Sequence, residues 1–190
     1  MQARRATIAG CIRRHFSTAR CWLFLRKRVA GRIKLRGRLN RVTIHSSFRC
    51  DGDLWLGIHS DEGEIVIEAG VTASGPLIVT AVRPLRIGAG CLFGPNVLVT
   101  DHYHGNPRDA THVALSPSER PLYSPGEILI GKDVQFGANS VILSPARIGG
   151  RAIIGANAIV KGEVPSGSIR TGFTNLGERP VSRITDGEGR

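Results

Sequence analysis

Residues 130–142 read Ile130-Gly-Lys-Asp-Val-Gln-Phe136-Gly-Ala-Asn-Ser-Val-Ile142, and a large apolar residue returns there at every sixth position. The same spacing continues through Ile148, Ile154 and Val160. Neither an α-helix nor an ordinary strand repeats at six residues. A period of six predicts a short strand followed by a turn, in units that bury their apolar side chains only by stacking on one another.

Three sets with the same spacing lie upstream, of which the first is weaker, and the register slips between one set and the next. Their members are Ile44, Cys50 and Leu56, then Ile67, Ala73 and Val79, then Ile87, Phe93 and Val99. We interpret each slip as an insertion at a corner, where Gly or Asn tolerates the backbone conformation. Three units close one triangular coil. The predicted fold class is therefore all-β, a parallel β-helix of hexapeptide repeats over residues 41–180; a β-sandwich would need this spacing to arise by coincidence.

The repeat stops after Val99 and resumes at Ile128, which predicts one extruded loop over residues 100–127. The loop opens with Asp101-His102-Tyr103-His104-Gly105 and also contains His112. Long insertions in compact domains are often functional. An imidazole at a rigid edge can take a proton from a hydroxyl that attacks a carbonyl. Asp101 either orients a ring or forms a turn, and we favour the turn. His102, His104, His112 and Asp109 could together bind a metal ion, but no metal site is predicted.

Four segments resemble the bacterial hexapeptide-repeat transferase family, and in particular its O-acetyltransferases of polysaccharide and lipopolysaccharide synthesis. They are residues 94–105, 130–137, 154–160 and Val164-Pro165, within a resemblance that runs from about Ile65 to Pro180. The resemblance implies a left-handed coil, a homotrimer, and acetyl-CoA as co-substrate with no permanently bound cofactor. It also implies a catalytic histidine at the start of the loop, a position that matches His102, with His104 as its competitor.

By the same resemblance, acetyl-CoA would lie in a groove between subunits. The matching positions are Gly137, Ala138, Gly155, Ala156 and Lys161. Gly-Ala pairs at a corner are also what the fold alone demands, and an exposed lysine is often only solvated. The segment Gly172-Phe-Thr-Asn175 departs from the Gly-x-Pro-Ala usual in the family, so the resemblance assigns no contact with the end of the coenzyme to this segment.

The expected activity is transfer of an acetyl group from acetyl-CoA to a hydroxyl of a sugar, or of a lipid-linked oligosaccharide, in surface polysaccharide or lipopolysaccharide biosynthesis. One alternative is a xenobiotic or small-molecule O-acetyltransferase of the same fold. The other is a non-catalytic scaffold that docks on a membrane or on RNA.

The charge is concentrated at the N-terminus. All 15 acidic residues but only 12 of the 26 basic residues lie after residue 50, so the first 50 residues carry 14 basic side chains and no acidic one. Residues 1–40 are predicted to form a basic, largely helical segment, with an amphipathic pattern over residues 4–30. This segment either caps the open end of the β-helix or contacts an anionic membrane through residues 4–38. Nucleic acid is not an expected partner, because aromatic residues do not interleave the charges.

The four cysteines form no CxxC pair, which favours a reducing compartment. The expected location is cytoplasmic, including the inner face of the cytoplasmic membrane. Residues 181–190 are predicted to be a C-terminal tail.

Overall fold

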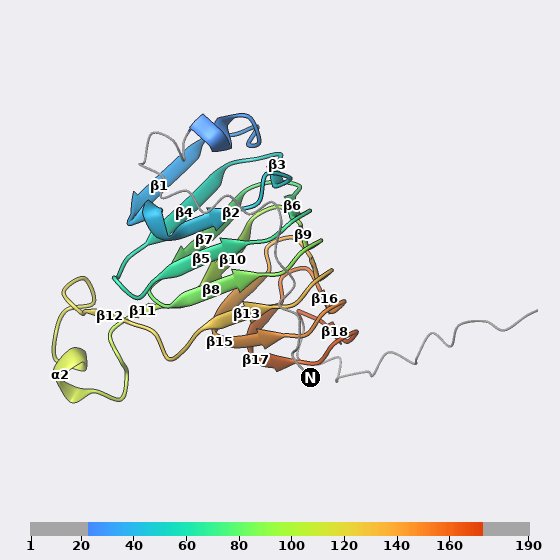
Figure 1. The fold of residues 1–190 in the computed structure, drawn as a ribbon. Coiled ribbons are helices and arrows are strands. Elements are labelled where there is room, and N and C mark those ends of the chain that lie inside the picture. The colour runs from blue at the N-terminus through green and yellow to red at the C-terminus, as the bar shows by residue number, and fades with distance from the viewer. Residues whose placement is uncertain (1–22, 173–190) are drawn as a thin grey trace, which may run out of the picture.

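Short parallel strands wind into a β-helix of about six coils with three flat faces (Figure 1). The computed structural model describes residues 23–172. Strands that follow one another in the chain lie on different faces, and each strand pairs with the strands one coil before and one coil after it. The predicted parallel β-helix of hexapeptide units is confirmed.

Two of the faces form one continuous ten-stranded sheet, because β15 runs from the first face into the second. The first face contains β1 (Ile33–Gly37), β4 (Leu54–Ile58), β7 (Leu77–Ala81), β10 (Val97–Thr100) and the first halves of β15 (Val141–Ile148) and β17 (Ile159–Val164). The second face contains β2 (Val42–Ile44), β5 (Glu64–Ile67), β8 (Pro84–Ile87), β13 (Ile128–Ile130) and the second halves of β15 and β17.

The third face is a six-stranded sheet of two-residue strands. It contains β3 (Arg49–Cys50), β6 (Thr72–Ala73), β9 (Leu92–Phe93), β14 (Gln135–Phe136), β16 (Ile153–Ile154) and β18 (Ile169–Arg170). A one-turn 3-10 helix, η1 (Leu39–Arg41), connects β1 to β2. The remaining elements belong to the loop: the antiparallel pair β11 (Tyr103–His104) and β12 (Leu122–Tyr123), and helix α2 (Ala110–Val113).

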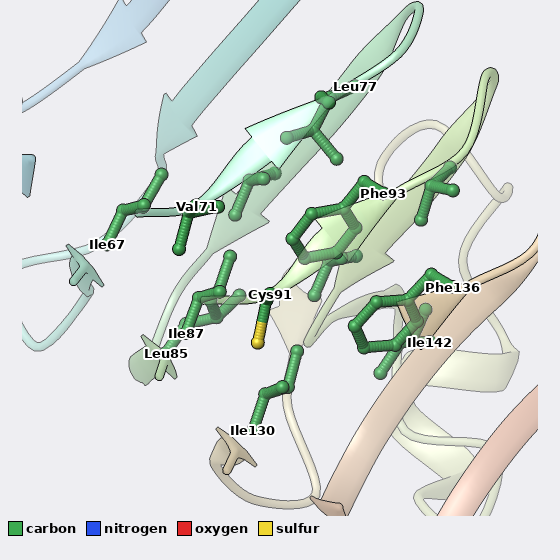
Figure 2. Close-up of a cluster of buried hydrophobic side chains, with 14 of the residues drawn as sticks. Ile67, Val71, Leu77, Leu85, Ile87, Cys91, Phe93, Ile130, Phe136 and Ile142 are labelled. Atoms are coloured by element: carbon green, nitrogen blue, oxygen red, sulfur yellow. The ribbon is translucent and has the colours of Figure 1, made fainter. Parts of the chain in front are cut away.

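The core is a column of inward side chains that stack in register from coil to coil. Val99 pairs with Val79 on one side and with Ile142 on the other, and all three are fully buried. The Phe93 and Phe136 rings lie parallel within the column, with centroids 4.5 Å apart and an interplanar angle of 1° (Figure 2). The six-residue period therefore identified the inward positions correctly.

Every register slip falls on one edge of the β-helix, the edge between the first and second faces, which we call the loop edge. Coils cross it through the segments 38–41, 59–63, 82–83 and 101–127, whereas β15 and β17 cross it without interruption. At this edge the longest segment, with α2 at its far end, extends well away from the coils (Figure 1). The insertions are therefore stacked above one another instead of being scattered over the surface.

The N-terminal end differs from the predicted division at residue 41. Strand β1 pairs in parallel with β4 along its whole length, and Val29 bridges to Cys50. The β-helix therefore begins within the segment expected to be helical. The alternation of Ile33 and Leu35 with basic residues is a half-buried strand pattern.

Within the predicted helix over residues 4–30, the described part has helical backbone at residues 23–26. No helix within residues 23–172 is long and apolar enough to span a membrane. The rest of the predicted helix over residues 4–30, and the predicted tail 181–190, lie outside the described residues.

Several arginines of the first coils donate hydrogen bonds to backbone carbonyl oxygens. Arg28 binds the carbonyl oxygens of Phe24 and Ser46, and Arg41 binds that of Gly63. Such contacts satisfy backbone groups near an open end of stacked strands. They support the capping interpretation for the described part of the basic segment.

Removing one ring from the core column should destabilise the fold strongly. We expect Phe93→Ala to lower the free energy of unfolding by about 3–5 kcal/mol, because it leaves a cavity beside the Phe136 ring. Gln135→Ala, on the solvent side of β14, is the matched control and should change it by less than about 0.5 kcal/mol. Denaturant unfolding followed by circular dichroism measures both. Equal losses in the two variants would contradict the stacked-core description.

Candidate active site

Asp101 is the first residue after β10, where the chain leaves the coils, and its side chain is completely buried. Its carboxylate accepts hydrogen bonds from the backbone N–H groups of Val82, at 2.9 and 3.1 Å, and Arg83, at 2.7 Å. Both donors belong to the preceding coil. A buried carboxylate is expensive to desolvate without such partners. Asp101 therefore anchors the start of the loop to the β-helix.

The same carboxylate holds the ring of His102. Oδ1 of Asp101 lies 3.0 Å from Nδ1 of His102, whose side chain is 13% exposed. Because a carboxylate only accepts hydrogen bonds, Nδ1 must carry the proton in this contact. Nε2 of His102 makes no hydrogen bond with any residue of the described range, so its lone pair is available to take a proton. Sequence reasoning favoured a simple turn for Asp101; the structure gives it an orienting contact instead.

The other loop histidines are placed differently. His104 lies opposite Leu122 in the β11–β12 pair and is exposed. His112 accepts a hydrogen bond from the backbone N–H of Asn106 through Nδ1, at 3.0 Å, and so stabilises the loop. Asp109 accepts from the N–H of Thr111 at the start of α2. Within residues 23–172 no group of three or more His, Cys, Asp or Glu side chains is arranged to hold a metal ion.

His59 is a second imidazole at the site, and sequence reasoning missed it. It follows β4 on the loop edge, and its ring meets that of His102 edge to face, with centroids 5.2 Å apart and an interplanar angle of 65°. Burial lowers the pKa of His59, and repulsion from His102 and from Arg36 lowers it further, while Asp101 acts in the opposite direction. The ring is therefore held in its neutral form more firmly than a free imidazole. His59 lies where the six-residue repeat slips, and this position was the only feature of the sequence that pointed to a role at the site.

Lys161 lies on the same loop edge, in the β17 strand that crosses it. Its Nζ is 5.6 Å from the centroid of the Tyr103 ring. The Tyr103 hydroxyl donates to the carbonyl oxygen of Ser144 at 3.4 Å, and the Ser144 hydroxyl donates to that of Asp101 at 2.5 Å. The structure therefore brings Lys161 and His102 to one region of the surface, joined by Tyr103.

The other predicted coenzyme contacts, Gly137, Ala138, Gly155 and Ala156, stack on a different edge, between the third and first faces. The N–H of Gly137 donates to the Ile154 carbonyl oxygen, and that of Gly155 donates to the Arg170 carbonyl oxygen, both at 2.7 Å. These two donors are used by the fold. By contrast, the N–H groups of Ala138 and Ala156 donate to no residue of the described part of the chain.

The glycines on this edge are also needed for packing. A Cβ at Gly137 would lie 2.3 Å from the backbone nitrogen of Ala156 in the next coil. Between these positions the side chains of Asn96, Asn139 and Asn157 form a ladder, each at a φ of 58–59°. Gly-Ala-Asn at these corners is therefore explained by coil stacking, and only the two alanine N–H groups are left to contact a ligand.

A groove of about 610 Å³ runs along the outer side of the second face, lined by Arg86, Leu129, Arg147 and Glu163 among others. None of the predicted site residues lines it. The candidate site around His102 lies instead where the loop edge meets the first face.

Comparison with known proteins concerns the repeat and the fold. Residues 127–162 match the family model "Bacterial transferase hexapeptide (six repeats)". The chain is 27% identical over 113 residues to WbbJ of Escherichia coli (strain K12), which is assigned as a lipopolysaccharide biosynthesis O-acetyl transferase; the match covers 58% of this chain and 57% of the relative. It is 46% identical over 68 residues to 2,3,4,5-tetrahydropyridine-2,6-dicarboxylate N-acetyltransferase of Staphylococcus aureus (strain JH9), and this match covers 36% of this chain and 28% of the relative.

Two solved structures share the fold. The polysialic acid O-acetyltransferase OatWY superposes with a TM-score of 0.56 at 19% identity, over 76% of this chain and 65% of that one. AntD, an N-acyltransferase from Bacillus cereus in complex with dTDP-4-amino-4,6-dideoxyglucose and coenzyme A, superposes with a TM-score of 0.54 at 15% identity, over 80% of this chain and 84% of that one.

The match to the transferase hexapeptide model is confined to residues 127–162, and the same six-residue coils continue on both sides of it in the structure. The chain spans just over half the length of the E. coli relative and about a quarter of the S. aureus one.

Replacing the buried carboxylate should weaken the fold at the loop edge. We expect Asp101→Asn to lower the free energy of unfolding by about 1.5–3 kcal/mol, because hydrogen bonds to a charged group are lost and an amide N–H₂ faces other donors. Asp133→Asn is the matched control: this exposed corner residue has a φ of 58°, which Asn tolerates, so its effect should be near zero. Chemical denaturation compares the two. A loss for Asp101→Asn no greater than for the control would contradict the anchoring role.

Proposed function

We propose that the chain is an acetyl-CoA-dependent O-acetyltransferase that modifies a sugar hydroxyl in surface polysaccharide or lipopolysaccharide biosynthesis. The observation that carries the proposal is the Asp101–His102 pair, held at the point where the β-helix is interrupted. The family match supports it, as does the relative WbbJ, which is assigned as an O-acetyl transferase.

In the proposed reaction His102 acts as the general base. Its Nε2 takes the proton of the acceptor hydroxyl as the hydroxyl oxygen attacks the thioester carbonyl carbon. The tetrahedral intermediate collapses with cleavage of the carbon–sulfur bond, and the proton passes from His102 to the departing CoA sulfur. The acetyl group forms a new ester with the acceptor oxygen. Asp101 contributes by fixing the ring and by stabilising the imidazolium formed during the step.

His102 is preferred to His104 as the base because only His102 has a carboxylate that orients it. The ring of His104 is exposed and on the hairpin strand β11. An exposed side chain is free to change rotamer, and such freedom weakens alignment with a reacting bond. His104 remains close enough along the chain to be the necessary comparison in any experiment.

For the acyl donor, we propose contacts from the free N–H groups of Ala138 and Ala156, with Gly137 and Gly155 providing close access to the backbone, and with Lys161 near the loop edge. The four glycine and alanine residues lie on one edge of the first face, which we call the glycine edge, whereas Lys161 and His102 lie on the opposite edge, the loop edge. A strand of four residues spans roughly 13 Å, so a thioester that meets His102 is distant from the glycine edge of the same chain. A site shared between copies brings one chain's loop edge to another's glycine edge.

We therefore propose a homotrimer, and the distribution of exposed apolar side chains on the outer surface supports it. The first and third faces, which meet at the glycine edge, carry exposed apolar side chains, namely Leu92, Ile153, Ile159 and Ile169. The second face carries Arg86, Arg147 and Glu163 at its outward positions. Exposed apolar side chains on two adjacent faces suit a closed ring of copies. Analytical ultracentrifugation tests the assembly, and a monomer at micromolar concentration would contradict it.

The proposed location is cytoplasmic, at the inner face of the cytoplasmic membrane, where a lipid-linked acceptor would be reached. The described arginines that donate to backbone carbonyls are already engaged by the fold, which weighs against a chain whose sole role is to dock on membrane or RNA. Flotation of the full chain with vesicles rich in anionic lipid tests membrane contact; a chain left entirely in the unbound fraction would remove that part of the proposal.

Substitution of the base tests the mechanism. We expect His102→Ala to lower the rate of acceptor-dependent CoA release from acetyl-CoA by about 10²–10⁴-fold, the usual contribution of a positioned general base. His104→Ala should stay within about threefold of the unsubstituted protein, because its ring lacks an orienting partner. CoA is measured with a thiol-reactive chromophore. Retained turnover in His102→Ala, or an equal loss in His104→Ala, would refute the assignment.

A further inference from the structure

A row of outward positions crosses the first face beside the two imidazoles. Arg36 on β1 lies opposite Gly57 on β4, Gly57 opposite Thr80 on β7, and Thr80 opposite Thr100 on β10. The Thr80 hydroxyl donates to that of Thr100 at 3.0 Å. The row therefore contains a guanidinium, a position with no side chain, the hydroxyl of the buried Thr80 and the hydroxyl of Thr100, in that order along the axis of the β-helix.

The gap at Gly57 is filled by the ring of His59. A Cβ at position 57 would lie 2.7 Å from Nε2 of His59, so a larger residue would displace the ring. In this position the ring reaches that of His102 two coils away, at 5.2 Å between centroids. The ring nitrogens of His59 have no hydrogen-bond partner within the described residues. Two imidazoles with unused nitrogens thus border the same patch of surface.

Arg36 differs from the other cations of its strand. The three others, on β1 or just beside it, are each paired: Arg32 with Asp53 at 2.9 Å, Lys34 over the Trp55 ring at 3.8 Å, and Arg38 with Asp61 at 2.5 Å.

The Arg36 guanidinium is exposed and makes no ion pair or hydrogen bond within residues 23–172, because the position opposite it, Gly57, offers no side chain. Its charge nevertheless acts on His59, whose pKa it helps to lower. An uncompensated positive charge therefore stands next to the imidazole pair.

We propose that Arg36 and His59 form the acceptor subsite beside His102, and that this subsite selects a sugar bearing an anionic group, either a carboxylate or a phosphate. A guanidinium binds both groups through paired hydrogen bonds. An imidazole nitrogen of His59 binds a sugar hydroxyl, and the anion lies toward the first coil, at the end of the row. The proposal rests on the proposed O-acetyl transfer and adds the class of acceptor to it.

Binding of three matched sugars to the full chain tests the subsite. Glucuronate and glucose 1-phosphate carry the two kinds of anion, and glucose carries neither. The ¹H–¹³C NMR signals of the His59 and His102 rings report occupancy directly. We expect each ring to respond to at least one anionic sugar at about tenfold lower concentration than to glucose, which corresponds to one charge-assisted contact. A response to glucuronate identifies the anion as a carboxylate, and a response to glucose 1-phosphate identifies it as a phosphate.

Two variants and one control separate the roles. Arg36→Gln should abolish the preference for the anionic sugar over glucose, while Arg38→Gln, which changes a cation already paired with Asp61, should keep it. His59→Phe preserves an aromatic ring against His102 but removes the nitrogens, so it should weaken glucose and the anionic sugars alike, as read at His102. Equal responses to all three sugars, no response to any, or an unchanged preference in Arg36→Gln would overturn the proposal.

Failure of the subsite can be told apart from failure of the proposed function. CoA release from acetyl-CoA is measured in parallel with the binding titrations. Binding that depends on Arg36 without any CoA release would leave the subsite standing and reject acetyl transfer. CoA release that depends on His102 without any preference for an anionic sugar would reject the subsite and leave acetyl transfer standing.

Discussion

The structure depends on one constraint: each coil must set its inward apolar side chains directly over those of the coil before it. Val79, Val99 and Ile142 illustrate the rule, since they are adjacent in space although they belong to different coils. A residue inserted within a coil cannot enter this column, so it must project outward at an edge. Between residues 23 and 172 all insertions use the same edge, and their stacking there brings together side chains that are far apart in sequence.

The candidate site is a consequence of that stacking. Asp101 stands where the longest insertion begins, and the shorter insertion one coil earlier presents the N–H groups of Val82 and Arg83 to its carboxylate. The insertion two coils earlier supplies His59. A buried carboxylate that is satisfied by a rigid backbone makes a firm support for an imidazole. The protein therefore positions His102 with the β-helix itself and needs no packed domain around it.

Much of the fold could be predicted from the sequence because its period is unlike that of any other secondary structure. The inward residues, the corners and the loop all follow from counting in sixes. Strand β1 was assigned to a helical segment because its basic side chains obscured the alternation of Ile33 and Leu35. The site was predicted less completely. His102 was found from its position at the break. Contacts between coils carry no signature along the chain, so the backbone donors that Val82 and Arg83 offer to Asp101, and the proximity of His59, could not be derived. Gly137 and Gly155 could not be separated into ligand contacts and packing positions until their N–H groups were seen to be occupied.

The central claim is that the edge of the β-helix holds His102 with its proton on Nδ1 and its Nε2 lone pair free. Long-range ¹⁵N–¹H correlation NMR of the histidine rings measures this tautomer directly at neutral pH. The structure predicts that the His102 signals are those of the Nδ1–H form, and that Asp101→Asn abolishes this preference. An Nε2–H tautomer for His102 in the unsubstituted protein would contradict the Asp101 contact and the role as a base that is built on it.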